Sequence, residues 1–184
     1  YFPNFITDHV HTPQGFVDAG AYNGDTLAEA MRYLPLREAW AFEPDPANFP
    51  LLAERARSLG APVTCLPCGV SSVNASLSFC GGHGDASTLG SEGNSHIQAL
   101  RLDDCLPNAR VDYLKLDVEG HELEALTGAE ALIRRNRPTL AIAGYHRRDD
   151  LWRIPAWITQ LGLDYRLRFR IHAHNSFDAV FYAY

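Results

Sequence analysis

The arrangement of apolar segments over residues 1–66 restricts the fold most strongly. Three short apolar segments, typical of buried strands, alternate with two segments that repeat apolar residues at i, i+3, i+4 and i+7, the spacing of one helix face. The strands are expected at 16–19, 39–42 and 63–66, with helices that start near Asp25 and after Asn48. Strands that alternate with helices are typical of a parallel sheet covered by crossover helices. The chain is therefore expected to be an α/β protein.

The rest of the chain interrupts this alternation and then resumes it. Residues 81–96 are rich in glycine and serine and too polar to pack, so they are expected to form a lid or an acceptor-binding loop. The later elements are expected as a strand over 111–118, a helix over about 121–135, a strand over 139–145 and a helix over 151–161 with Pro155 in its first turn. Residues 165–184 predict two strands joined near 174–176, which is an antiparallel hairpin.

Length and charge narrow the class of protein. The 184 residues suit a single domain, 1–184, that begins with an N-terminal extension over 1–15. The net charge of −6 argues against a nucleic-acid partner held mainly through phosphates. No apolar run approaches the roughly 18 residues of a membrane span, and no signal peptide is visible, so no membrane partner is expected. The sequence does not predict an oligomeric state.

The chain contains four cysteines, and two of them, Cys65 and Cys68, form a CxxC motif. A zinc site would need two further ligands at matching spacing, and the sequence has no second CxxC. The motif also follows a predicted strand, whereas a redox pair usually opens a helix that lowers the thiol pKa. These cysteines are therefore expected to be small buried residues with reduced thiols, and the cytoplasm is the expected compartment.

Segment 18–26, DAGAYNGDT, joins the first predicted strand to the first predicted helix. Gly20 and Gly24 permit a left-handed backbone and the close approach of a ligand, and the helix beyond them begins with unpaired N–H groups. The spacing differs from the GxGxxG fingerprint of dinucleotide-binding folds, because Asp18 takes the place of the first glycine. A carboxylate there would repel a pyrophosphate and attract an amine or a sulfonium cation. A tight turn without a ligand is the alternative.

Glu43 ends the second predicted strand, where a carboxylate can accept both ribose hydroxyls of a nucleoside. A helix-capping acid is the alternative when Glu43 is considered alone. Together with the glycine loop, however, Glu43 predicts an adenosine-containing cofactor. Asp18 favours S-adenosylmethionine over a nicotinamide cofactor, because its carboxylate would repel a pyrophosphate. The terminal hairpin favours it as well, because nicotinamide-binding domains are mostly all-parallel.

Four stretches of the sequence resemble the FkbM-type methyltransferases, namely FVDAGAYNGDT, AFEPDPANFPLL, YLKLDVEGHELEALTGAEALI and RPTLAIAGYH. The resemblance covers roughly residues 14–184; its most specific part is the LDVEGHE block, and segment 81–96 does not align. It implies a Rossmann-like class I methyltransferase fold, with a seven-stranded, mostly parallel sheet, an antiparallel last strand and helices on both faces. It also implies S-adenosylmethionine as cofactor and O-methylation of a small hydroxylated molecule, such as a sugar or a secondary metabolite.

The same resemblance assigns cofactor contacts to residues of this chain. Those at the amino-acid end of the cofactor would be Asp18, Gly20, Tyr22, Asn23 and Gly24. Glu43 would hold the ribose, and Pro44, Asp45 and Cys68 would lie near the adenine. Asp117, at the end of a later strand, would face the methyl donor.

Charged residues crowd the end of the strand predicted at 111–118, and they are Asp117, Glu119, His121, Glu122 and Glu124. In an open α/β sheet, ligands bind outside the carboxyl ends of the strands, so Asp117 is expected to face both the methyl donor and the acceptor. Glu119 is expected to point the same way, because residues alternate across a strand. Glu122 and Glu124 fall in the first turn of the next helix, where negative charge is stabilised by about 0.3–1 kcal/mol, and they are expected to serve that helix terminus.

An alcohol acceptor must lose a proton during methyl transfer, so a base is expected beside Asp117. His146, which ends the next strand, is the first candidate for this base, and Asp117 and His121 are the others. No metal site is predicted, although Asp117 and Glu119 are oxygen ligands of the kind that Mg²⁺ prefers. The histidines of HVH (9–11) and HAH (172–174) are expected to lie on the surface.

The sequence therefore predicts an S-adenosylmethionine-dependent O-methyltransferase. Two alternatives stay open. A methyltransferase fold without catalysis could serve as a binding module of a larger protein, and a nicotinamide-dependent dehydrogenase would share the glycine loop and Glu43.

Overall fold

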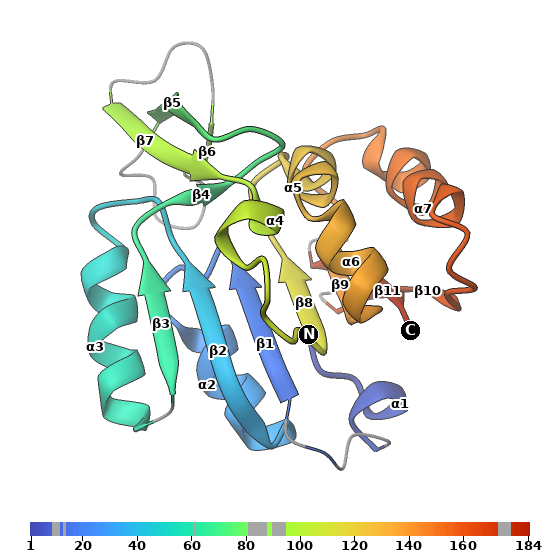
Figure 1. Ribbon diagram of the computed structural model, residues 1–184, viewed down its shortest axis with the longest axis horizontal. Coiled ribbons are helices and arrows are strands. Elements are labelled where there is room, and N and C mark those ends of the chain that lie inside the picture. The colour runs from blue at the N-terminus through green and yellow to red at the C-terminus, as the bar shows by residue number, and fades with distance from the viewer. Residues whose placement is uncertain (9–11, 13, 61, 81–87, 90–94, 173–177) are drawn as a thin grey trace.

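A computed structural model describes residues 1–8, 12, 14–60, 62–80, 88–89, 95–172 and 178–184 (Figure 1). Its centre is a seven-stranded sheet in the order β10-β11-β9-β8-β1-β2-β3. The strands are β1 (Gln14–Ala19), β2 (Leu36–Phe42), β3 (Val63–Leu66), β8 (Tyr113–Leu116), β9 (Thr139–Ala143), β10 (Leu167–Ile171) and β11 (Ala179–Ala183). Strand β11 runs antiparallel to both of its neighbours, β9 and β10, and the other pairs in the sheet are parallel. The predicted α/β fold with an antiparallel terminal hairpin is thus confirmed.

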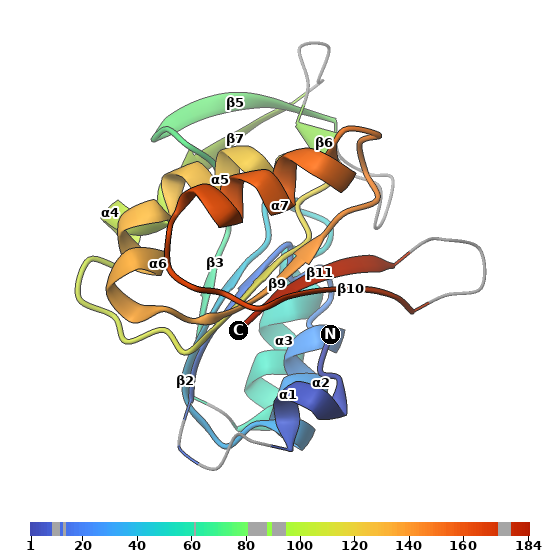
Figure 2. The same ribbon diagram turned by 90° about the vertical axis from the view of Figure 1, so that its right-hand side faces the viewer.

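Helices cover both faces of this sheet (Figure 2). One face carries α1 (Asn4–Thr7), α2 (Asp25–Tyr33) and α3 (Phe49–Leu59), and the other carries α4 (Leu102–Cys105), α5 (Glu122–Gly128), α6 (Glu130–Asn136) and α7 (Asp150–Gln160). Adjacent residues of a strand point to opposite faces. Phe16 and Tyr113 accordingly pack with α2 and α3, while Val17 and Leu114 pack with α5 to α7. Burial on both faces explains why the central strands are almost continuously apolar.

A second sheet occupies the region in which the alternation of strands and helices is interrupted. It consists of β4 (Gly69–Val70), β5 (Ala75–Cys80), β6 (Thr88–Leu89) and β7 (Ser95–Leu100), in the order β4-β7-β5-β6. Figure 1 shows it beyond the arrowheads of β1, β2, β3 and β8, so it lies over the carboxyl-end edge of the main sheet. Of the segment 81–96, residues 81–87 and 90–94 lie outside the described residues, and its role as a lid or acceptor loop stays a prediction. The HVH motif and residues 173 and 174 of HAH lie outside them as well.

Two expected helices differ from the structure. The helix expected over about 121–135 is two helices, α5 and α6, that meet at Ala129. The carboxylate of Asp103 accepts hydrogen bonds from the backbone N–H groups of Ala131 and Leu132, at 3.2 and 2.8 Å, and so caps the second helix from outside. A cap that comes from a distant part of the chain leaves no local signal, and for this reason the periodicity alone suggested one continuous helix.

Pro155 lies inside α7 and not in its first turn as expected. A proline lacks the N–H that would bond to the carbonyl four residues earlier, and here that carbonyl belongs to Leu151. Leu151 is 51% exposed, so water can replace the missing donor and the helix continues. Among the described residues, no helix has both the length and the apolar character that crossing a membrane requires.

Candidate active site

The glycine loop leaves β1 at the carboxyl-end edge of the sheet and leads into α2. Gly20, Tyr22 and Gly24 all have left-handed backbone conformations, with φ of 78°, 48° and 82°. A Cβ on Gly20 would overlap the backbone carbonyl oxygen of Asp117, so only glycine fits at that position. Asn23 holds the turn from within, because its Oδ1 accepts a hydrogen bond from the N–H of Asp25 at 3.1 Å. The loop is therefore pressed against the end of β8.

Glu43 connects this loop to the turn after β2. Its Oε2 accepts a hydrogen bond from the N–H of Tyr22, and its Oε1 accepts one from the N–H of Asp45, both at 2.8 Å. The side chain is buried, and burial raises the pKa of its carboxyl although the backbone donors oppose that effect. A carboxylate has about four acceptor positions, and the side chain of Asn48 occupies a third besides the two backbone donors, so Glu43 retains capacity for a further donor.

The residues expected near an adenine surround the same turn. Asp45 is buried, and its Oδ1 accepts a hydrogen bond from the N–H of Ala47 at 2.8 Å. Pro44 lies against Gly69, the residue that follows the buried Cys68. Burial raises the pKa of the Cys68 thiol to about 12, so it is a buried neutral thiol at neutral pH. The structure brings Pro44, Asp45 and Cys68 to one end of β2 and β3, and their contact with a cofactor stays a prediction.

Asp18 forms a buried ion pair with Lys115. The two residues are register partners on the neighbouring strands β1 and β8, and Lys115 Nζ lies 3.0 Å from Asp18 Oδ1. Nζ also donates a hydrogen bond to the backbone carbonyl of Gly20 at 2.6 Å, so the lysine holds the start of the glycine loop. Burial would lower the pKa of Lys115, but the charges of Asp18 and Asp117 raise it, so the lysine keeps its proton.

This lysine was missed by the sequence reasoning, although a signal for it exists. A lysine inside the apolar strand YLKL requires a buried partner for its charge, and the apolar strand segment FVDA contains an acidic residue of the right kind, Asp18. The carboxylate that was expected to attract a ligand cation therefore already faces a cation of the protein itself. Its contact with the amino-acid end of a cofactor is not tested by this geometry.

Asp117 lies directly after β8 and accepts two phenolic hydroxyls. Tyr1 donates to its Oδ2 at 2.6 Å, and Tyr145 donates to its Oδ1 at 3.1 Å. Its side chain is 20% exposed, so it lies at the rim of the sheet and not inside it. The expected position of Asp117 beside the glycine loop is therefore what the structure shows.

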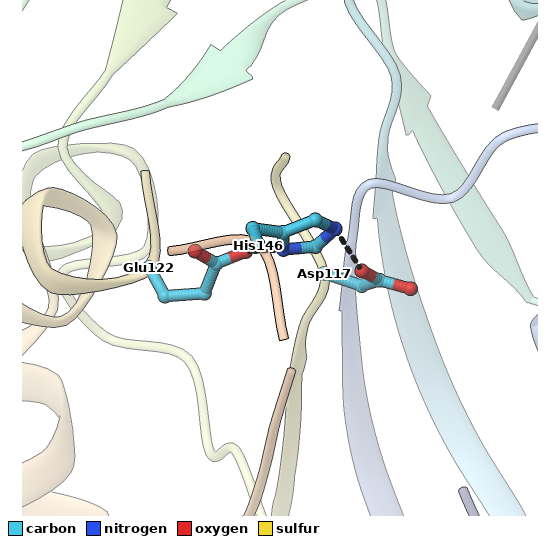
Figure 3. A group of neighbouring side chains, drawn as sticks. All are labelled: Asp117, Glu122 and His146. Atoms are coloured by element: carbon cyan, nitrogen blue, oxygen red, sulfur yellow. Dashed lines mark hydrogen bonds and ion pairs between the residues drawn. The ribbon is translucent and has the colours of Figure 1, made fainter. Parts of the chain in front are cut away.

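His146 lies between three carboxylates (Figure 3 draws two of them). Its Nε2 is 3.5 Å from Asp117 Oδ1 and 3.3 Å from Glu119 Oε2, and its Nδ1 is 2.9 Å from Glu122 Oε1. The structure thus brings together Asp117, Glu119 and His146, as expected from the sequence. His121 is the N-cap residue of α5, on the loop that carries these side chains.

The carboxylates determine the protonation of His146. Burial would lower the pKa of His146, but its contacts with Glu119 and Glu122 and the charge of Asp117 raise it to about 10. The imidazole consequently carries a proton at neutral pH. A protonated imidazole cannot accept another proton, so His146 could act as the base only after losing the proton that these carboxylates hold.

Glu122 lies in the first turn of α5, as expected, but it also makes contacts beyond the helix terminus. It is completely buried, and its Oε1 accepts hydrogen bonds from the N–H groups of Val118 and Gly120 at 3.0 and 3.4 Å, besides its contact with His146. It therefore shapes the loop between β8 and α5, in which Glu119 is left-handed with φ of 55°. Glu124 lies in the first turn of α5, as expected.

Comparisons with known proteins agree with this geometry. The sequence profile described as methyltransferase FkbM domain matches residues 18–171. The chain is similar to the hexuronic acid methyltransferase AglP of Haloferax volcanii, with 35% identity over 98 residues in a match that covers 48% of this chain and 40% of that protein. It is also similar to the crystal structure of methyltransferase FkbM from Methylobacillus flagellatus KT, with a TM-score of 0.80 and 26% identity over 98% of this chain and 46% of that chain.

A more distant solved structure shows the fold alone. It is an rRNA methylase from Streptococcus thermophilus, with a TM-score of 0.61 and 16% identity over 98% of this chain and 91% of that one. The chain thus spans less than half the length of AglP and of the Methylobacillus flagellatus methyltransferase, while the fold itself recurs in a protein of about the same length.

Proposed function

This chain belongs to the FkbM methyltransferase family, and from that premise we propose that it transfers a methyl group from S-adenosylmethionine to a hydroxyl oxygen of a small molecule. One observation carries the assignment to oxygen. Each oxygen of the Asp117 carboxylate accepts a hydrogen bond from a phenolic hydroxyl, so this side chain already binds O–H donors at the edge where the fold holds its ligands.

The residues of the glycine loop and the turn after β2 fit the cofactor. The left-handed loop brings backbone against Asp117. The buried Glu43 carboxylate already accepts two backbone N–H groups and the side chain of Asn48, and it retains acceptor capacity for a ribose hydroxyl. When bound, S-adenosylmethionine would supply a methyl group on a positively charged sulfur, and S-adenosylhomocysteine would remain.

Asp117 is the proposed proton acceptor. A hydroxyl oxygen that bonds to a methyl carbon gives up its proton. The acceptor hydroxyl would donate its hydrogen bond to Asp117 in the place of Tyr1 or Tyr145, and Asp117 would take the proton through that bond. His146 would hold the carboxylate in place from the other side, because its Nε2 lies 3.5 Å from Asp117 Oδ1. Orientation of the reacting atoms and exclusion of water would supply much of the remaining rate, up to about 7–11 kcal/mol for well-placed reactants.

A sugar is the proposed class of acceptor. The name of the Haloferax volcanii relative supports this, since it describes a methyltransferase that acts on hexuronic acid. The net charge of −6 supports a small molecule over a nucleic acid, even though the fold is shared with an rRNA methylase.

Calorimetry with S-adenosylhomocysteine tests the cofactor, and transfer of a labelled methyl group to hydroxylated acceptors tests the reaction. We expect Asp117→Asn to abolish transfer while the protein still binds S-adenosylhomocysteine. Asp164→Asn is the matched control, because Asp164 is exposed and left-handed, with φ of 57°, a conformation that asparagine tolerates. A folded protein that fails to bind millimolar S-adenosylhomocysteine would overturn the proposal.

A further inference from the structure

The cluster around His146 has more negative charge than its single imidazole can balance. Asp117, Glu119 and Glu122 all lie within 3.5 Å of a ring nitrogen. We propose that this cluster is a binding site for one divalent metal ion, with His146 Nε2, Asp117 and Glu119 as ligands and Glu122 as the residue that orients the imidazole. The proposal goes beyond methyl transfer and does not depend on it, because binding of the ion can be measured without cofactor or acceptor.

The geometry on the Nε2 side of the ring suits a small ion. Bonds of about 2.1 Å place neighbouring ligand atoms of an octahedral ion roughly 3.0 Å apart. Nε2 lies 3.5 Å from Asp117 Oδ1 and 3.3 Å from Glu119 Oε2, so a small movement would bring each oxygen to that distance from Nε2. Asp117 and His146 belong, with Glu122, to a group whose possible ligand atoms lie within 4.8 Å of one another, and Glu119 would turn toward Asp117 to complete the ligand set. Glu119 can make such a movement, because its side chain is 26% exposed. Asp117 would exchange the hydrogen bond that Tyr145 donates to its Oδ1 for the ion.

The opposite side of the ring is held rigidly. Glu122 is fully buried, and its Oε1 receives two backbone N–H groups and lies 2.9 Å from Nδ1. Histidines that bind metals usually donate their second N–H to a carboxylate or a carbonyl, which fixes the tautomer and leaves the other nitrogen free to bind. Glu122 makes this arrangement with His146, and Figure 3 shows the imidazole between Glu122 and Asp117.

Two buried atoms of the cluster lack a hydrogen-bond partner among the described residues. They are Nε2 of His146, whose side chain is only 9% exposed, and Oε2 of Glu122, which is fully buried. Buried polar atoms in folded proteins are usually satisfied, so unpartnered ones require an explanation such as an ion. Nε2 lies 3.3–3.5 Å from two carboxylates without forming a well-aligned hydrogen bond to either, and the ion would take the place of the proton that Nε2 carries.

The ligand chemistry indicates the class of metal. Carboxylate oxygens suit Mg²⁺, Ca²⁺ and Mn²⁺, and an imidazole nitrogen shifts the preference toward transition metals. Mn²⁺ satisfies both kinds of ligand and is therefore the probe. Lys115, the one lysine of the sequence, is paired with Asp18 at 3.0 Å and is not a contact partner of His146.

The test measures Mn²⁺ binding to chelator-treated protein by electron paramagnetic resonance. The signal of free Mn²⁺ decreases as the ion binds to the protein, and this decrease gives the bound fraction. We expect one site per chain, and we expect His146→Gln and Asp117→Asn each to weaken binding by at least about tenfold. Glu122→Gln should weaken it by about 10–100-fold. His96→Gln is the matched control, because His96 is exposed on β7, outside the cluster, and binding should be unchanged.

Circular dichroism of each variant shows whether it folds. If His146→Gln does not fold, Asp117→Asn tests the metal site instead, because Asp117 lies at the rim of the sheet. The proposal is overturned if the folded wild type binds no Mn²⁺ at millimolar concentration, or if His146→Gln and Asp117→Asn both bind it as tightly as the wild type. Calorimetry with S-adenosylhomocysteine in the presence of chelator reports on the cofactor separately, so failure of one proposal does not imply failure of the other.

Discussion

Gly20 lies so close to Asp117 that a Cβ on residue 20 would overlap the backbone carbonyl oxygen of residue 117. This contact joins the loop after β1 to the loop after β8, which are the two loops that carry most of the candidate site. Their relative position therefore depends on the absence of a side chain at one residue.

Gly20→Ala should disturb this contact. The alanine would clash with rigid backbone and would also adopt φ near 78°, so we expect a loss of at least about 2 kcal/mol in the free energy of unfolding and a loss of S-adenosylhomocysteine binding. Urea denaturation and calorimetry measure the two effects. The matched control is Gly60→Ala, where φ is 63° but no atom lies within 4 Å of the added Cβ, and where only the conformational cost of about 1 kcal/mol is expected. Equal effects of the two substitutions would contradict the packing argument.

The ion pair between Asp18 and Lys115 should be costly to break from one side. Lys115→Met leaves a fully buried carboxylate without its cation, and we expect a loss of about 3–5 kcal/mol in the free energy of unfolding. The double variant Asp18→Asn with Lys115→Met should recover a large part of that loss, as measured by a double-mutant cycle in urea. Arg153→Met serves as control, because its pair with Asp149 is exposed, and no measurable change is expected there. If the double variant were no more stable than Lys115→Met alone, the coupling would be absent.

Glu43→Gln should weaken cofactor binding. The amide would place an N–H₂ group against the N–H of Tyr22 or Asp45 and would remove the charge that receives the ribose hydroxyls. We expect the Kd for S-adenosylhomocysteine to rise by about 10–100-fold, the effect of hydrogen bonds to a charged group. Calorimetry measures it, with Glu38→Gln as control because Glu38 lies on the same strand with its side chain 43% exposed. A Kd that responds equally to both substitutions would exclude the specific role of Glu43.

Cys68 should be unreactive in the folded protein. Burial raises the pKa of its thiol to about 12, so roughly one molecule in 10,000 carries the thiolate at pH 8. We expect alkylation of Cys68 by iodoacetamide to be at least about 100-fold slower than in the same protein unfolded in urea, as followed by site-resolved mass spectrometry. Fast labelling of native Cys68 would show that the residue is accessible as a thiolate and would reopen the redox role that its CxxC motif could suggest.

Several parts of the fold and the site could be predicted from the sequence. The order of the strands and helices follows from local periodicity, and the site at the ends of β1, β2 and β8 follows from the general placement of ligands in open α/β sheets. The position of Asp117 beside the glycine loop was predicted in this way. The contact of Glu122 with His146 was not predicted, because a glutamate in the first turn of a helix looks the same whether it faces solvent or turns inward to a histidine 24 positions later.

The sequence by itself therefore determined the fold class, the antiparallel hairpin and the edge of the sheet at which the candidate site lies, because these depend on patterns that span a few neighbouring residues. Tertiary structure decided which charges meet. The register of β1 against β8 pairs Asp18 with Lys115, and the spacing of β8 and β9 brings His146 between Asp117, Glu119 and Glu122. Such distances depend on how separate strands align and pack, and the free energy of that alignment is spread over the whole core, so no local pattern records it.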